Sequence, residues 1–173
     1  FTALCLAALL AACASSPSSS LGELPRTPDA SLEQLLQQAA QSQNPEQAAL
    51  LRLSAADLAY KQHNFDRAKQ ILAQVPLDQL KPAQQVFAST LSAELAMSRN
   101  QTKEALTALS HPSVARLNEM PADLQVRSHT VYARALEADG QTLAAARERA
   151  AMSPLLTGDA ANSNNDAIWS LVA

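Results

Sequence analysis

The feature that most constrains the fold of this chain is an almost continuous helical pattern from Ser31 onward. Apolar residues, mostly alanine and leucine, recur at helical spacing, and no segment shows the period of two expected of a strand. Aromatic residues make up only 3% of the chain and glycine occurs three times, which is a helical composition. Breaks at proline, asparagine, histidine and glycine divide the pattern into helices expected at residues 31–42, 45–62, 65–75, 82–99, 102–110, 122–139, 142–152 and 165–173.

Long and short segments alternate, and three long–short pairs align on one alanine in the shorter segment. These alanines, Ala68, Ala105 and Ala145, are 37 and 40 residues apart. Small residues at such positions let two helices approach closely. A proline closes each pair: Pro76, Pro112 and Pro154.

The pairs resemble the tetratricopeptide repeat, which also has an alanine in its second helix and a closing proline. Their spacing exceeds the usual length of about 34 residues, and the signature tryptophan and tyrosine are absent, so the repeats are degenerate. We therefore expect an all-α fold, a tetratricopeptide-like solenoid of helical hairpins over residues 31–173. An ordinary alanine-rich helical bundle is the alternative.

The N-terminal stretch "ALCLAALLAA", residues 3–12, is apolar and too short to span a bilayer, but it has the length of a signal-peptide core. It leads into "LAAC", which resembles the lipobox of bacterial lipoproteins, so residues 1–12 are expected to be a signal peptide truncated at its start. The resemblance implies that Cys13 becomes the lipidated N-terminal residue and that Cys5 is discarded. Ala14 after the cysteine, rather than aspartate, points to the outer membrane. The alternative is a core helix with a buried free cysteine.

Residues 14–30 are rich in serine and proline and have few apolar side chains to bury. We expect residues 13–30 to form a lipidated cysteine followed by a flexible tether. With both cysteines inside the first fifteen residues, packing and not disulfides is expected to hold the body together.

Neither catalytic nor ligand-binding chemistry is predicted. The net charge of -3 with no basic block argues against nucleic-acid binding. His63, His111 and His129 are far apart in sequence, so no metal site is expected. The three glycines are isolated, so no phosphate or dinucleotide loop is expected, and Gly140 is explained as a helix C-cap. Glu94 and Glu148 are expected on solvated helix faces. We predict a protein that is not an enzyme and carries no cofactor.

The aromatic residues after the tether are interpreted as core residues rather than a ligand cage: Tyr60, Phe65, Phe87, Tyr132 and Trp169. Trp169 stands in "AIWSLVA", an apolar stretch without a polar finish, whereas solenoids normally end in a polar capping helix. The repeat domain is therefore expected to continue into a missing C-terminal domain.

The order of features resembles the N-terminal region of the penicillin-binding protein activator (LpoA) family: a lipobox cysteine, a Ser/Pro tether, helical hairpins such as "FDRAKQILAQVP", then "SPLLTGDAANSNNDAIWSLVA". The resemblance implies an outer-membrane lipoprotein that binds a class A penicillin-binding protein and stimulates peptidoglycan synthesis without catalysing it. Only Cys13 carries over as a site residue. Two alternatives remain, a helical-repeat assembly factor or pilotin-like lipoprotein, and a peptidoglycan hydrolase with its active site elsewhere.

Overall fold

The computed structural model describes residues 20–26 and 29–173 of the chain. Across these residues all regular secondary structure is helical, which confirms the expected all-α class. Eight α-helices and three short 3-10 helices follow one another in this described part: α1 (Leu32–Gln41), α2 (Pro45–Lys61), α3 (Phe65–Leu72), η1 (Leu77–Gln79), α4 (Pro82–Met97), α5 (Thr102–Leu109), η2 (Pro112–Glu119), α6 (Ala122–Ala138), α7 (Thr142–Met152), η3 (Ser153–Leu155) and α8 (Gly158–Val172).

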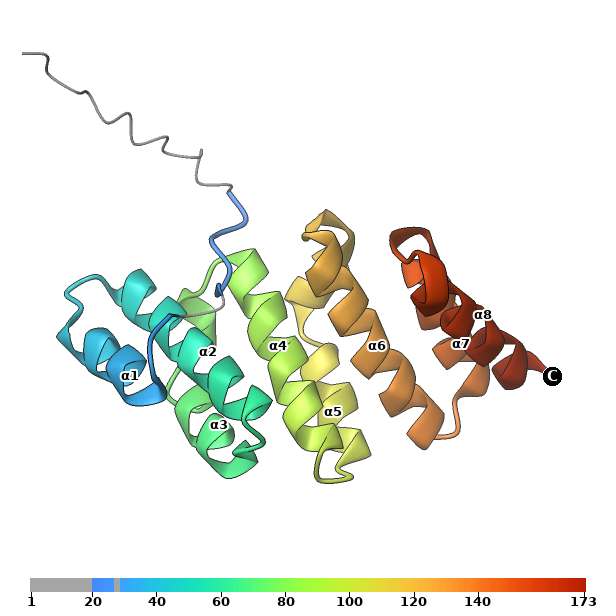
Figure 1. The fold of residues 1–173 in the computed structure, drawn as a ribbon, viewed down its shortest axis with the longest axis horizontal. Helices are drawn as coiled ribbons and strands as arrows, with labels where there is room; N and C mark the ends of the chain where they lie inside the picture. The colour runs from blue at the N-terminus through green and yellow to red at the C-terminus, as the bar shows by residue number, and fades with distance from the viewer. Residues whose placement is uncertain (1–19, 27–28) are drawn as a thin grey trace, which may run out of the picture.

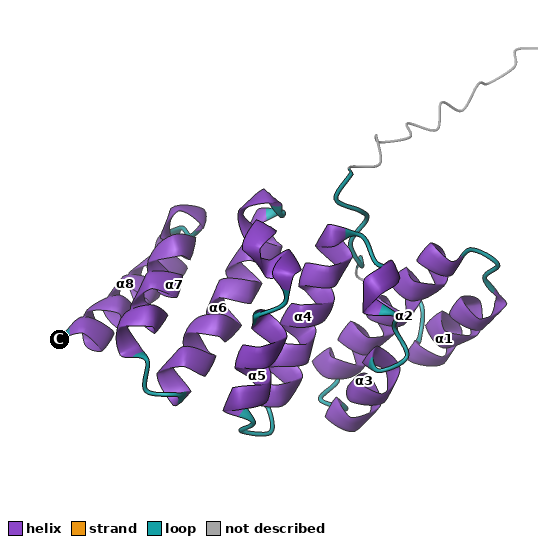
Figure 2. Ribbon diagram, turned by 180° about the vertical axis from the view of Figure 1, so that it is seen from behind, coloured by secondary structure: helices purple, strands orange, loops and turns teal. Residues whose placement is uncertain are grey.

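The helices are arranged as three hairpins in a row (Figure 1). Each hairpin joins a long helix to the shorter one that follows, so that α2 packs on α3, α4 on α5, and α6 on α7. The helix α1 packs on α2 at one end of the row and α8 packs on α7 at the other (Figure 2). This is the predicted solenoid. Within the described residues no helix is both long and apolar enough to cross a membrane.

Side-chain caps explain where several helices begin. The Ser31 hydroxyl accepts a hydrogen bond from the Gln34 backbone N–H, and the Gln34 side chain accepts one in return from the Ser31 N–H. Asn44 caps α2 through the N–H groups of the first turn, and Pro45 occupies the first helical position. These local signals are readable in sequence, which is why the predicted starts of most helices agree with the structure.

The three hairpin turns repeat the same backbone conformation at the predicted spacing. His63, Asn100 and Gly140 have φ values of 60°, 57° and 78°, and they are 37 and 40 residues apart. The next residue in each turn donates its backbone N–H to a carbonyl near the end of the long helix, at 2.9, 2.9 and 2.8 Å. This left-handed turn is the usual end of a helix, and it confirms the interpretation of Gly140.

The aligned alanines are buried within the hairpins. Ala68, Ala105 and Ala145 are each fully buried. Among the described helices, α4 has the most buried residues. They extend along most of its length, because α4 packs against both neighbouring hairpins. One hydrophobic cluster extends from α1 to the start of α6, and a smaller one joins α4, α5 and α6.

Two predictions about the C-terminal part are wrong. The last helix begins at Gly158 and not at residue 165, because the buried Asn164 holds this polar stretch against α7 by donating to the Arg149 carbonyl and the Ser153 hydroxyl. Trp169, which the sequence predicts in the core, is 72% exposed, since α8 is packed on one side only within the described residues. Of the other four aromatic residues, Phe87 is buried, and Tyr60, Phe65 and Tyr132 are half-buried.

The expected signal peptide at residues 1–12 and the expected lipidation at Cys13 lie outside the described residues. Residues 20–26 belong to the segment expected to form the tether, and the structure places them against the helical body. In Figure 1 this blue segment passes the N-terminal end of α4. The Leu21 carbonyl accepts a hydrogen bond from the Ala83 N–H at 2.8 Å.

Candidate functional site

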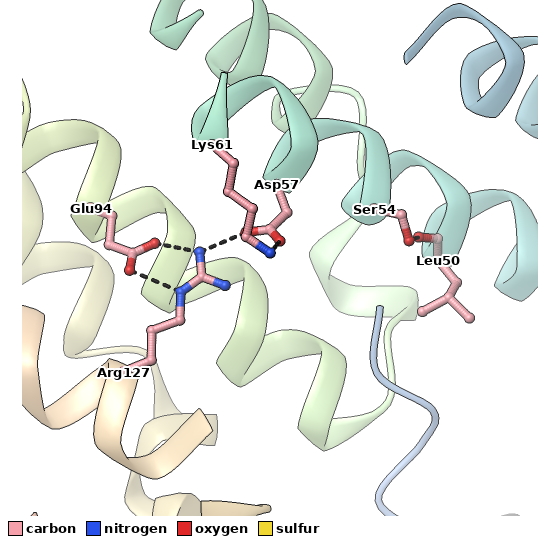
Figure 3. Close-up of polar contacts among 6 residues, drawn as sticks. All are labelled: Leu50, Ser54, Asp57, Lys61, Glu94 and Arg127. Atoms are coloured by element: carbon pink, nitrogen blue, oxygen red, sulfur yellow. Dashed lines mark hydrogen bonds and ion pairs between the residues drawn. The ribbon is translucent and has the colours of Figure 1, made fainter. Parts of the chain in front are cut away.

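One side of the row is formed by the long helices α2, α4 and α6, and an arginine from α6 joins all three. Arg127 donates two hydrogen bonds to Glu94 on α4, from Nε at 2.9 Å and from Nη2 at 2.6 Å. Its Nη2 also donates to Oδ1 of Asp57 on α2 at 2.7 Å. Lys61 pairs with the other Asp57 oxygen at 2.7 Å (Figure 3). We call Asp57, Glu94 and Arg127 the inter-repeat clasp.

The clasp is largely withdrawn from water. The side chains of Asp57, Glu94 and Arg127 are 10%, 13% and 24% exposed. Burial acts to lower the pKa of Arg127, but its hydrogen bonds and charge interactions with Glu94 and Asp57 outweigh burial, and the net effect raises the pKa. The guanidinium also lies 5.1 Å from the centre of the Phe87 ring, within the range of a cation–π contact. Arg127 therefore stays charged and fixed.

A tyrosine stands beside the clasp on α2. The pKa of the Tyr60 phenol is raised, first by burial and then by the negative charge of Glu94. The phenol therefore remains neutral at physiological pH, and nothing in this geometry activates it as an acid or a base.

The segment 20–26 covers part of this side of the row and leaves a hollow beside the clasp. The hollow has a volume of about 210 Å³ and is bounded by Leu24, Pro25 and Arg26 on one side and by Asp57, Phe87 and Arg127 on the other. A second hollow of about 350 Å³ lies between the first two hairpins, with Leu72, Val75 and Leu95 in its wall and charged side chains around it. Both hollows are open to solvent, as binding surfaces of helical repeats are.

The residues considered for chemistry from the sequence do not come together. His63 lies in the α2–α3 turn, and the His111 ring accepts a hydrogen bond from the Ser113 N–H at the start of η2. His129 on α6 contacts Glu148 on α7 at 2.8 Å. Among residues 20–26 and 29–173, no group of three or more His, Cys, Asp or Glu side chains could hold a metal ion.

The prediction of solvated faces for Glu94 and Glu148 is wrong, because both carboxylates are paired and mostly buried. Sequence reasoning also missed Asp57 and Arg127. One signal was available, since Asp57 and Glu94 are 37 residues apart and so occupy equivalent positions in successive repeats. Arg127 does not occupy the equivalent position in the third repeat. Only the packing of α6 beside α4 shows that it meets these two carboxylates.

These features define a class of protein, an all-helical repeat protein whose long helices are joined by a buried ion-pair clasp. The LppC putative lipoprotein family matches the chain over residues 25–173. The chain belongs to this family. No curated protein sequence matches it significantly.

Solved structures with the same fold are LpoA proteins. The amino-terminal domain of Escherichia coli LpoA has a TM-score of 0.60 and 22% identity, over 84% of this chain and 63% of that domain. Full-length LpoA of Haemophilus influenzae has a TM-score of 0.58 and 20% identity, over 90% of this chain and 27% of that protein. The predicted resemblance to the LpoA N-terminal region is confirmed. At these identities the likeness shows the fold, and the chain spans about a quarter of full-length LpoA.

Proposed function

We propose that this chain is the helical part of an outer-membrane lipoprotein, anchored through acyl chains on Cys13, which binds a class A penicillin-binding protein and stimulates peptidoglycan synthesis. The observation that carries the proposal is the family match over residues 25–173 together with the LpoA N-terminal fold. The "LAAC" stretch supplies the thiol that such lipidation requires. Two or three acyl chains give stable anchorage, whereas one gives marginal binding.

The proposed role is not catalytic. A repeat body of this kind acts by presenting a surface in a fixed shape, and the clasp supports that role by holding α2, α4 and α6 in one register. The side of the row around the clasp and the hollow between the first two hairpins are the surfaces offered to a partner. A synthase that contacts either surface would meet a rigid and mixed-charge face.

The proposal is tested by binding and by activity together. The lipoprotein expressed from its full gene, and a protein limited to residues 20–173, are each mixed with a purified class A penicillin-binding protein. Glycan polymerisation and peptide crosslinking are followed alongside a pull-down. We expect the full lipoprotein to bind and to accelerate polymerisation, and the shorter protein shows whether the repeats take part in contact.

The principal alternative is a repeat lipoprotein with another partner, such as an outer-membrane assembly factor or a secretin pilotin. It shares the anchor and the hairpins, so the fold does not separate the two. Absence of both binding and stimulation in the assay would favour this alternative over the activator.

A further inference from the structure

The segment of residues 20–26, which we call the strap, supplies a cap that α4 lacks in its own sequence. The first backbone N–H groups of a helix have no partner within it, and a Ser, Thr, Asp or Asn before the helix usually accepts one of their bonds. Before α4 stands Lys81, whose ammonium only donates. The Leu21 carbonyl takes the place of that cap and accepts from the Ala83 N–H at 2.8 Å.

A buried amide holds the strap at a second point. Gln84 is fully buried, and its Nε2 donates to the Glu23 carbonyl at 3.0 Å. Its Oε1 accepts from the Lys81 N–H at 3.2 Å, so both ends of the amide have partners. If the strap left, the Gln84 Nε2 would lose its partner, which is costly for a buried donor.

At Gly22 the strap lies so close to the body that only glycine fits. Gly22 has a φ of +96°, and a Cβ placed on it would lie 2.5 Å from the Cβ of Lys81. Both the conformation and the space exclude a side chain there. On either side of Gly22, Leu21 and Leu24 are half-buried and pack against the main hydrophobic cluster. Backbone hydrogen bonds, the Gln84 side chain and close packing at Gly22 therefore hold the strap on the body together.

We propose that the strap determines which part of the helical body lies nearest the membrane. It does so by attaching the N-terminal end of α4 to the lipidated Cys13 through a short stretch of chain. This inference rests on the proposed lipidation of Cys13. Eight residue steps separate Cys13 from Leu21, and at no more than about 3.6 Å each they reach at most about 29 Å. Without the strap the first fixed residue would be Ser31, eighteen steps away, with a reach of about 65 Å and a different point of attachment on the body.

The position of the strap favours the start of α4 as the part of the row nearest the membrane. The strap meets the body at the start of α4, within the row and not at the free end beyond α1 (Figure 1). The opposite end of α4 is about 24 Å away along its axis, since the helix has 16 residues. In the proposed arrangement the turn between α4 and α5 lies at this opposite end and faces away from the lipid, which leaves it open to a partner on the other side.

Site-specific fluorescence quenching tests this arrangement. Once Cys5 is removed and Cys13 is acylated, residues 13–173 contain no free thiol, so with any cysteine elsewhere in the lipoprotein replaced by serine one introduced cysteine is labelled alone. A fluorophore is placed at the exposed Gln79, just before α4, or at the exposed Lys103, near the far end of α4. The full lipoprotein is inserted into vesicles of phosphatidylethanolamine and phosphatidylglycerol that carry nitroxide headgroups. We expect quenching at position 79 to be at least twofold stronger than at position 103.

The strap variant is Gly22→Ala, with Ser20→Ala as the matched control on the exposed start of the same segment. Gly22→Ala should bring the quenching ratio of the two positions toward one and leave helical circular dichroism unchanged, whereas Ser20→Ala should change neither. Equal quenching at the two positions in the wild-type lipoprotein would overturn the proposal.

A second measurement separates the strap from the anchor. Amide exchange of Ala83 is followed by NMR in the full chain carrying Cys13→Ala, which needs no membrane. We expect Ala83 to exchange at least tenfold more slowly than in the same chain with Gly22→Ala. An unprotected Ala83 amide would refute the strap itself. Failure of the wild-type lipoprotein to insert into vesicles, with Ala83 protected, would instead refute the lipid anchor.

Discussion

The Nη2 of Arg127 on α6 lies 2.7 Å from Oδ1 of Asp57 on α2, although the two residues are 70 positions apart in the chain. The same guanidinium binds Glu94 on the intervening helix α4. One side chain therefore joins three successive repeats, and among the described residues its contact with Asp57 spans the largest sequence separation of any side-chain hydrogen bond. Its removal should affect the solenoid as a whole and not one hairpin.

The first prediction concerns the clasp. Arg127→Met should lower the free energy of unfolding by about 2–4 kcal/mol, because it leaves the mostly buried Glu94 without a cation and leaves Asp57 with only the more exposed Lys61. Urea denaturation followed by circular dichroism measures the change. Arg116→Met is the control, since Arg116 forms an exposed pair with Glu119 within η2, and surface pairs contribute little. Similar losses in the two variants would contradict a special role for the clasp.

The second prediction concerns the small residues between helices. Ala145→Leu should destabilise the protein by about 1–3 kcal/mol, because Ala145 is fully buried and the added atoms have no space. Ala150→Leu, on the exposed side of the same helix α7, should leave stability nearly unchanged. Thermal unfolding of both variants makes the comparison. If Ala145→Leu were neutral, close helix approach at the aligned alanines would not be required.

The third prediction concerns the hairpin turns. Gly140→Ala should lower the free energy of unfolding by about 1 kcal/mol, because alanine disfavours the φ of 78° found here. No atom lies within 4 Å of the new methyl group, so backbone strain is the whole effect. His63→Gly should act in the opposite direction, since His63 adopts the same left-handed conformation with a side chain. Both changes are measured by urea denaturation. If both substitutions changed the free energy of unfolding in the same direction, the two turns would not share the same conformational requirement.

The fourth prediction concerns pH. Burial, and after it the charge of Glu94, raises the pKa of Tyr60, so the folded state favours the neutral phenol. That stability is fully present below the unfolded pKa of about 10 and is lost as the pH rises through the higher folded value. The difference in absorbance at 295 nm between wild type and Tyr60→Phe, titrated from pH 8 to 12, reports this group. We expect a midpoint above 10, and a midpoint at or below 10 would contradict the prediction.

Local signals explain what the sequence predicts well. The caps at Ser31 and Asn44 and the aligned alanines act within one or two helices, so their patterns are visible in the chain. The clasp depends on which helices become neighbours, and Arg127 gives no local sign of its partners. The same is true of the strap, since a Ser/Pro-rich segment gives no indication that its carbonyls cap α4. The early start of α8 follows from the buried Asn164, which propensity alone disfavours in a helix.

The lipid anchor is the claim on which the proposed localisation and the role of the strap both depend. Its most direct test is intact-mass analysis of the protein purified from membranes after expression from the full gene. We expect a mature chain that begins at Cys13 and carries acyl chains, and a Cys13→Ser variant that keeps its helical circular dichroism but leaves the membrane fraction. A mature chain that begins elsewhere, or one with an unmodified Cys13, would contradict the lipid anchor.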